Sequence, residues 1–338
     1  MALPIRGVNY DVGTNFAAGE LSRDGLTDER LREELLTIRN DLHADSVAIY
    51  GTPLDRLVRA ATIAAEAGLR VWLQPRLVDG RPRDLLDRLT EAARAAEDLR
   101  RGHGHVVLSV GCELSIFARG VVPGRGYERR MARLGTMAGY ALTPWFTRRL
   151  NRLLGRAAAV VRSVFGGPVT YAQGSWEQVD WTPFDLVCVN LYRTADNAGT
   201  YAEELAAFQR HGKPLVISEF GCAAFDGAAE LGPLAHEVVE LGGPRPTLKG
   251  PPVRNERVQA DHLAELLDLY EAARVEGAFV YEFIEPAYHH SPDPRHDLDM
   301  AGYGLVKVLP TGGDGYTWHP KAAFHTVSER FARGGGVP

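Results

Sequence analysis

The chain has 338 residues, of which 45% are hydrophobic and 24% are charged, and it carries a formal net charge of -5. An acidic chain is a poor ligand for nucleic acid, because neutralising phosphates needs a basic face. With three cysteines and no apolar run long enough to span a bilayer, we expect a cytoplasmic globular enzyme without a disulfide framework or a membrane partner.

Apolar, strand-like runs alternate with helix-like segments from one end of the chain to the other. Eight of these runs are expected to be strands: residues 5–10, 46–50, 70–74, 106–110, 169–172, 186–191, 215–218 and 278–283. Parallel strands joined by helices require right-handed crossovers. The alternation therefore predicts an α/β fold, a single (β/α)8 barrel over residues 1–338.

Helix-capping and loop signals add detail to this pattern of strands and helices. Thr52 followed by Pro53 is typical of an N-cap with proline at the first helical position, and Gly68 is expected to end that helix. The segment GSWEQVDWTPFD, residues 174–185, is too short for a full helix and is expected to be a loop with one turn. Long stretches follow the fourth and seventh strands, and we expect both loops to wall or cover a pocket.

Two glutamates end apolar runs that are typical of buried strands. Glu113 follows HVVLSVGC at the fourth strand, and Glu219 follows KPLVIS at the seventh. The carboxyl ends of barrel strands are where such folds carry their catalytic groups. The pair is therefore a candidate general acid and nucleophile facing one substrate bond, as glycoside hydrolysis needs. The alternative interpretation is that each glutamate forms a structural salt bridge.

Three motifs, read in order along the chain, resemble the clan A glycoside hydrolases, nearest the β-galactosidase and β-glucuronidase branch. PLVISEFGCAAFDG (214–227) is similar to the nucleophile strand of that branch, and FDLVCVNLYR (184–193) is similar to its sixth strand. GLVKV (304–308) and WHPKAAFHTV (318–327) are similar to the end of these barrels, where a proline–lysine pair opens the last helix.

The resemblance implies a role for several residues. Glu113 would be the acid/base and Glu219 the nucleophile of a retaining mechanism, with carboxyl groups about 5–5.5 Å apart. Asn190 and Tyr192 occupy alternate positions of one strand and so share a face. In the family, a tyrosine such as Tyr192 hydrogen-bonds the nucleophile, although an ordinary residue at the lip of the barrel is an equally good interpretation.

The sequence also departs from the family pattern at three points. The family usually has Asn before the acid/base, where this chain has Cys112. The arginine usually near the nucleophile is missing from the second strand, although Arg76 after the third strand could reach it. The eighth strand usually presents Trp, where YEFIEP offers Glu282 and Glu285. These changes affect the usual sugar contacts and leave the two catalytic carboxylates in place.

Further candidate substrate contacts lie at the ends of other strands. Asn9 and Tyr10 end the first strand, Tyr50 ends the second, and Trp176 follows the fifth. Trp176 is a candidate platform for stacking against a sugar face, as are Trp72, Trp181 and Trp318. Aromatic residues at barrel rims also pack as ordinary hydrophobic residues.

The stretch YHHSPDPRHDLD after the eighth strand, residues 288–299, gathers histidines and aspartates. Its spacing matches no zinc signature, so we expect a hydrogen-bonded loop and neither a metal nor another cofactor. A third interpretation is that, with Glu282 and Glu285, the loop makes an acidic site for a polyhydroxylated or cationic substrate. Cys112 and Cys222 are expected to pack as small residues, because a cysteine nucleophile would need a histidine partner.

The sequence thus predicts a retaining glycoside hydrolase that cleaves a β-linked sugar in a small-molecule or oligosaccharide substrate. The alternative is a non-hydrolytic glycosidase-like barrel. It would be a sugar-binding pseudoenzyme, or an enzyme of small-molecule metabolism that uses the paired acids differently. Neither hypothesis specifies the sugar or the oligomeric state.

Overall fold

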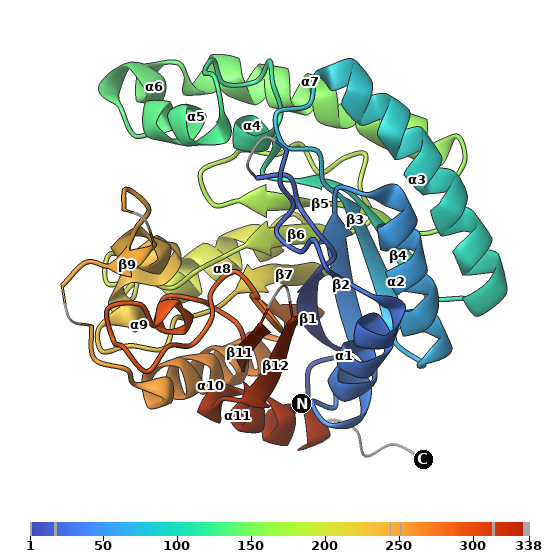
Figure 1. Ribbon diagram of the computed structural model, residues 1–338. Coiled ribbons are helices and arrows are strands. Elements are labelled where there is room, and N and C mark those ends of the chain that lie inside the picture. Colours follow the sequence, from blue (N-terminus) through green and yellow to red (C-terminus); the bar gives the residue numbers. More distant parts are fainter. Residues whose placement is uncertain (1, 17–18, 244, 251, 313–314, 334–338) are drawn as a thin grey trace.

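Eight parallel strands close into a barrel in the computed structural model, which describes residues 2–16, 19–243, 245–250, 252–312 and 315–333 (Figure 1). The strands follow one another around the barrel in chain order. They are β1 Ile5–Asp11, β2 Ser46–Gly51, β3 Arg70–Pro75, β4 Val106–Cys112, β5 Val169–Gly174, β6 Val187–Asn190, β7 Leu215–Phe220 and β10 Gly277–Val280. All eight expected strands are confirmed; the last ends at Val280, earlier than the expected residue 283.

Helices cover the outside of the barrel (Figure 1). They are α1 Asp28–Asn40, α2 Leu54–Glu66, α3 Pro82–His103, α7 Thr143–Arg162, α8 Tyr201–Gln209, α10 Glu256–Ala273 and α11 Ala322–Arg333. In α1, Leu31, Leu35 and Ile38 are buried against the strands at helical spacing, and the Thr27 side chain accepts a hydrogen bond from the Arg30 amide (3.3 Å). This apolar layer between strands and helices is the main core.

The expected N-cap of α2 is wrong by one position. The cap residue is Pro53 and the helix begins at Leu54. The Thr52 hydroxyl instead donates to Asn15 Oδ1 (2.7 Å), which ties the loop after β1 to the end of β2. Gly68 follows the helix with φ of +81°, as the expected helix end requires.

No helix joins β5 to β6 in the described chain, as expected from the length of that segment. In its place a tight loop is held by the buried carboxylate of Glu177. This carboxylate accepts hydrogen bonds from the Gly174 amide (3.1 Å), the Ser115 amide (2.9 Å) and the Tyr171 hydroxyl (2.7 Å). The loop after β5 is thereby joined to the loop after β4.

Long insertions follow β4 and β7, as the sequence indicated. The β4 insertion, residues 113–145, holds α4 Leu114–Phe117, α5 Tyr127–Leu134 and α6 Met137–Ala141, before and into α7. The β7 insertion, residues 221–255, holds α9 Ala228–Leu231, η1 Gly232–Val238, β8 Val239–Glu240 and β9 Thr247–Leu248. Figure 1 shows α5 and α6 projecting beyond the barrel wall, with α9 and β9 on the same side of the view.

Between β10 and α11 the chain adds a short helix, η2 Leu298–Met300, and an antiparallel hairpin of β11 Val306–Gly312 and β12 Gly315–Pro320. The hairpin was not expected from the sequence. Its Trp318 packs against Phe283 just beyond β10 (5.8 Å between ring centres), and Tyr316 donates to Glu34 of α1 (2.8 Å). The hairpin therefore closes the outer layer between the last and first strands. Within the described residues, we find no helix long and apolar enough to cross a membrane.

Candidate active site

Glu113 and Glu219 both stand at the carboxyl end of the barrel, Glu113 directly after β4 and Glu219 near the end of β7. Asn190, the last residue of β6, connects them. Its amide Nδ2 donates to Glu113 Oε1 (3.0 Å) and to Cys112 Sγ (3.3 Å), and the Cys112 thiol donates to Glu219 Oε1 (3.6 Å). The two carboxyl groups therefore belong to one hydrogen-bonded network.

Glu219 is buried and receives a charged partner from across the barrel. Arg76 Nη2 donates to Glu219 Oε1 at 2.9 Å, which confirms that the arginine after the third strand reaches Glu219. The Tyr192 hydroxyl donates to Glu219 Oε2 (3.5 Å). Burial raises the pKa of Glu219. The charge of the Arg76 guanidinium and the hydrogen bonds from Cys112 and Tyr192 oppose that rise. These contacts favour the carboxylate form.

Among the described residues, no arginine, lysine or histidine forms an ion pair with the Glu113 carboxyl group. Burial and the nearby charge of Glu219 raise the pKa of Glu113 to about 8, against the hydrogen bond from Asn190. Of the two carboxyls, Glu113 is therefore the one that retains a proton more readily, because the Arg76 guanidinium contacts Glu219 and not Glu113. Glu113 also lies in the left-handed region, with φ of 46°, a conformation that costs energy outside glycine and that is often found at functional sites.

The segment after Glu113 is held from the β5 side. The Leu114 amide donates to the Tyr171 hydroxyl (2.6 Å), and the same hydroxyl donates to Glu177. The indole of Trp176 donates to Ser115 Oγ (3.0 Å) and is half-buried. Of the four tryptophans considered as platforms, Trp176 is therefore the one that lies near the candidate acid/base, Glu113.

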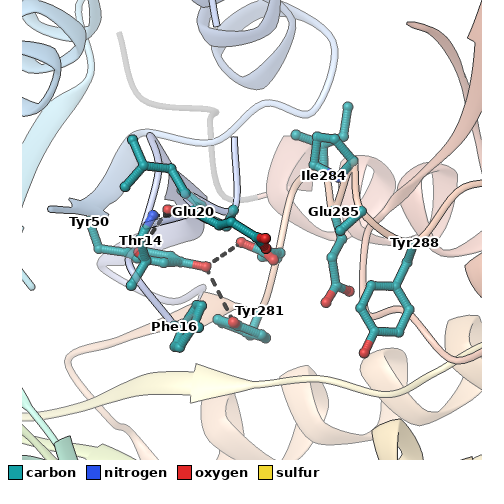
Figure 2. A pocket seen from close by; sticks show the side chains of 14 residues that line it. Thr14, Phe16, Glu20, Tyr50, Tyr281, Ile284, Glu285 and Tyr288 are labelled. Carbon is teal, nitrogen blue, oxygen red and sulfur yellow. Dashed lines mark hydrogen bonds between the residues drawn. The ribbon is translucent and has the colours of Figure 1, made fainter. Parts of the chain in front are cut away.

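A cavity of about 290 Å³ opens over the ends of β1, β2 and β10 (Figure 2). Neither Glu113 nor Glu219 is among its lining residues, and the expectation that the β4 and β7 insertions wall the pocket does not hold for this cavity. Glu282, Tyr50 and Tyr281 form its floor: the Tyr50 hydroxyl donates to Glu282 Oε2 (2.5 Å) and lies 3.2 Å from the Tyr281 hydroxyl. The guanidinium of Arg76 lies over the Tyr50 ring, 3.8 Å from its centre. Arg76 therefore links the cavity to Glu219.

Carboxyl groups and aromatic rings dominate the lining of this cavity. Its residues are Asp11, Thr14, Phe16, Glu20, Leu21, Ser22, Tyr50, Tyr281, Glu282, Ile284, Glu285, Pro286, Ala287 and Tyr288. Burial, and then the nearby charges of Glu285 and Asp11, raise the pKa of Glu282 well above its usual range. Glu285 accepts from the Tyr303 amide (2.8 Å) and lies 3.2 Å from His236 Nε2. Both strand-eight carboxyls, Glu282 and Glu285, therefore line this cavity.

Some expected contacts are wrong. Tyr10 points out of the barrel: its hydroxyl donates to Glu34 of α1 (2.5 Å), so it belongs to the core. Asn9 points inward but lies below the site, where its amide donates to the backbone of Ser218 (2.9 Å). The other tryptophans are not platforms either. Trp72 packs inside the barrel, Trp181 packs on Phe184, and Trp318 belongs to the hairpin.

The alternation of side chains along β1 and β2 could have shown which of these residues face the inside of the barrel. Because side chains of a strand alternate between faces, an inward Asn9 requires Tyr10 to face outward and Asp11 to face inward. Asp11 lines the cavity and was missed, as were Tyr281 and Tyr288. Tyr281 directly precedes Glu282, so the position of that glutamate at a strand end was the available signal. The sequence carried no signal for the bracing role of Glu177.

The histidine- and aspartate-rich loop is held by an arginine. Arg254 donates to Asp297 (3.0 Å) and Asp299 (2.7 Å), and His290 Nδ1 lies 2.9 Å from Asp297. Among the described residues there is no group of three or more His, Cys, Asp or Glu side chains arranged to hold a metal ion. Asp297 and Asp299 are ion-paired with Arg254, and neither residue lines the cavity. The suggestion that the whole loop acidifies the site is therefore wrong; Glu282 and Glu285 alone contribute from this region.

No cysteine is prepared for nucleophilic chemistry. Burial raises the pKa of Cys112 well above its usual value, and burial raises the pKa of Cys222 to about 12. Cys112 contacts an amide and a carboxylate rather than a histidine. Its thiol serves as a small hydrogen-bond donor within the network.

Solved structures show which fold this is. A GH113 β-1,4-mannanase aligns with a TM-score of 0.62 at 15% identity, over 98% of this chain and 99% of that one. β-Glucuronidase 2 of Bacteroides uniformis, covalently bound to cyclophellitol-6-carboxylate aziridine, aligns with a TM-score of 0.60 at 17% identity, over 99% of this chain and 35% of that one. The chain therefore shares the (β/α)8 barrel fold of these enzymes.

A third match has a bound sugar. Thermotoga maritima Cel5A in complex with mannotriose aligns with a TM-score of 0.54 at 14% identity, over 96% of this chain and 98% of that one. The chain spans about a third of the length of the β-glucuronidases and nearly the whole of the mannanase and of Cel5A. No family model and no curated protein matches the sequence.

Proposed function

We propose that this chain is a retaining glycoside hydrolase that cleaves a β-linked sugar by double displacement, with Glu219 as nucleophile and Glu113 as acid/base. The observation that carries the proposal is the unequal environment of the two carboxyls. Glu219 has the Arg76 guanidinium at 2.9 Å, whereas the pKa of Glu113 is raised to about 8. One ionised and one protonated carboxyl are what the first step of this reaction requires.

In the first step the Glu219 carboxylate attacks the anomeric carbon while Glu113 gives its proton to the glycosidic oxygen. The carbon–oxygen bond to the leaving group breaks, and the freed alcohol carries that proton away. The charge on Glu219 is consumed in the new ester bond. This change lowers the electrostatic cost of ionising Glu113, so the residue becomes a base when the glycosyl-enzyme forms.

In the second step Glu113 removes a proton from water, and the resulting oxygen nucleophile attacks the anomeric carbon. The ester bond to Glu219 breaks, the sugar leaves with retained configuration, and Glu113 is protonated again. Asn190 contributes to both steps, because its hydrogen bond orients the Glu113 carboxyl. Cys112 contacts Glu219 where the family usually has a sugar-binding Asn.

The site also supports an assignment of the two sides of the substrate. Glu113 must lie beside the leaving oxygen, and Trp176 and the loop after β5 flank that residue. The cavity over β1, β2 and β10 lies on the Arg76 side of the network. We assign the cavity to the sugar that Glu219 attacks, and the Trp176 side to the leaving group.

A panel of aryl β-glycosides tests the reaction. We expect a burst of aryl alcohol from at least one sugar, and a matching 2-fluoro sugar should add its mass to a peptide that contains Glu219. Labelling on another residue would contradict the assignment of the nucleophile. Sugar binding without release of any aryl alcohol would favour the non-hydrolytic alternative, whose support is Cys112 in place of Asn and the carboxyls at strand eight.

A further inference from the structure

Exposed hydrophobic side chains are confined almost wholly to the two insertions at the carboxyl end of the barrel. Of the ten large hydrophobic residues that are exposed in the described chain, nine lie in the β4 or β7 insertion. Met137 and Tyr140 of α6 are 85% and 77% exposed, and Leu241 of the β7 insertion is 78% exposed. Apolar groups gathered in this way mark an interaction surface.

The β4 insertion and the first part of α7 are together strongly basic, although the chain is acidic. Residues 125–156 contain eight arginines and a single acidic residue, Glu128. Arg130 is buried and pairs with Asp79. The other seven form no ion pair within the described residues: Arg125, Arg129, Arg133, Arg148, Arg149, Arg152 and Arg156. Elsewhere in the chain many arginines are paired, so this is a concentration of uncompensated charge.

Helix α7 shows how apolar and basic groups are arranged together. Its inner face buries Phe146, Leu150 and Leu154 in the core. On the outer side Trp145 is exposed, and the Arg149 guanidinium lies over its ring at 4.2 Å from the ring centre. The apolar tip formed by α6 and Trp145 therefore continues directly into a row of arginines.

We propose that the carboxyl-end face of the barrel binds an anionic lipid bilayer, with α5, α6 and the start of α7 inserting the apolar tip and the arginines contacting lipid phosphates. The β7 insertion supplies a second apolar contact through Leu234 and Leu241. This interaction goes beyond the proposed reaction and does not depend on it. It also revises the expectation of no membrane partner, which rested on overall charge and on the lack of a spanning segment.

The chemistry of the tip favours a bilayer over other anionic partners. Tyrosine and tryptophan beside arginine are typical of the bilayer interface, where the rings reach the acyl boundary and the cations remain among the head groups. Nucleic acid would use the arginines but gain little from an exposed methionine and leucines. A second copy of this chain would use the apolar residues but bring the uncompensated arginines of the two copies together.

Vesicle sedimentation tests the proposal. We expect the protein to bind vesicles of phosphatidylcholine with about a quarter phosphatidylglycerol at least ~10-fold more strongly than vesicles of phosphatidylcholine alone, and to be released by salt. Brominated lipid should quench Trp145 fluorescence, and the quenching should disappear in the Trp145→Phe variant. Circular dichroism should show that this variant remains folded.

Two variants separate the contributions of charge and of the apolar tip. Arg148→Gln/Arg152→Gln/Arg156→Gln should lose the preference for anionic vesicles, and Met137→Ser/Tyr140→Ser should lose binding even at low salt. Two controls lie elsewhere on the surface. Arg32→Gln/Arg210→Gln/Arg257→Gln removes the same charge, Leu36→Ser removes an exposed apolar side chain outside the tip, and both should bind as the parent does. All of the residues replaced in these variants and controls are exposed.

Three results would overturn the proposal. One is equal or absent binding to the two kinds of vesicle. Another is binding that the control triple reduces as much as the α7 triple does. The third is a dimer in solution that already shields Trp145 from an aqueous quencher without lipid, which would assign the tip to contact between two copies.

Discussion

Arg76 and Glu219 form a 2.9 Å ion pair although they come from opposite sides of the barrel. Arg76 directly follows β3, and four steps around the sheet separate β3 from β7. Two residues on opposite strands of a barrel can meet in this way only if both have long side chains that point to the barrel axis, at its carboxyl end. The pair therefore fixes the position of the Glu219 carboxylate, whereas Glu113, directly after β4, forms no ion pair within the described residues.

Removing the nucleophile should abolish turnover. In Glu219→Gly no remaining group can form the covalent intermediate, since the Cys112 thiol is held neutral by burial. We expect azide to restore part of the activity by entering the vacated space and to give a glycosyl azide of inverted configuration. Chromatography and proton NMR of the product identify it. A product of retained configuration would assign the nucleophile elsewhere.

Removing the acid should affect substrates unequally. Glu113→Ala should slow aryl glycosides with poor leaving groups by about 10²–10⁴-fold, because their departure needs a proton. Substrates with good leaving groups should be cleaved in the first step almost as fast as by the parent. The slope of log kcat/KM against leaving-group pKa measures this difference. An identical slope for the Glu113 and Glu219 variants would show that the roles are assigned wrongly.

Activity should decline on the alkaline side near pH 8. The first step needs protonated Glu113, and its pKa is raised to about 8 by burial and by the Glu219 charge. As the pH rises through that value the proton is lost, so kcat/KM falls. In Glu219→Gln the charge is gone, and the pKa of Glu113 should move down towards its usual range; carbon NMR of the labelled carboxyl reads it directly. An unchanged pKa would mean that the two carboxyls are not coupled.

Replacing Arg76 should destabilise the fold as well as the reaction. Arg76→Met leaves the buried Glu219 carboxylate without a cation, which should cost about 3–5 kcal/mol of unfolding free energy at neutral pH. The cost should diminish at acidic pH, where Glu219 can be protonated in the variant. Urea unfolding at several pH values measures it. The exposed Arg83→Met on α3 is the control and should change stability by less than about 1 kcal/mol.

Neutralising Glu285 should weaken binding more than chemistry. The carboxyl lines the cavity and is bonded to the Tyr303 amide, but it has no contact with Glu113 or Glu219. Glu285→Gln should therefore raise KM and leave kcat close to the parent value. Glu203→Gln on α8, exposed and remote, should change neither constant. A fall in kcat with unchanged KM would place Glu285 in the reacting centre instead.

The sequence predicted the barrel well because its signal is local. Each strand is an apolar run buried on both faces, and polar residues such as Glu113 and Glu219 appear where such a run ends. Side-chain direction was harder. Tyr10 was expected in the site because it ends an apolar run, yet alternation turns it towards Glu34. The loop of residues 288–299 was expected to be hydrogen-bonded, but its ion pairs to Arg254 could not be predicted, because Arg254 is distant from it in sequence.

Contacts between distant segments carried no readable signal. The β11–β12 hairpin, the bracing by Glu177 and the crossing of Arg76 over the Tyr50 ring all depend on the closed barrel to bring their partners together. The exposed tip of the β4 insertion is a further case. Only the folded arrangement shows that the arginines of residues 125–156, apart from Arg130, form no ion pair within the described chain, and that Arg149 lies over the Trp145 ring.

Residues 125–156 are basic whereas the rest of the chain is acidic, and this uneven distribution of charge gives the molecule an electric dipole. The basic end coincides with the side of the barrel from which Glu113 emerges, while the chain as a whole carries a charge of -5. In the field of any anionic surface such a molecule experiences a torque before it makes contact, so it arrives with the mouth of the barrel foremost. Salt should therefore act mainly on how fast the molecule associates, by weakening that alignment.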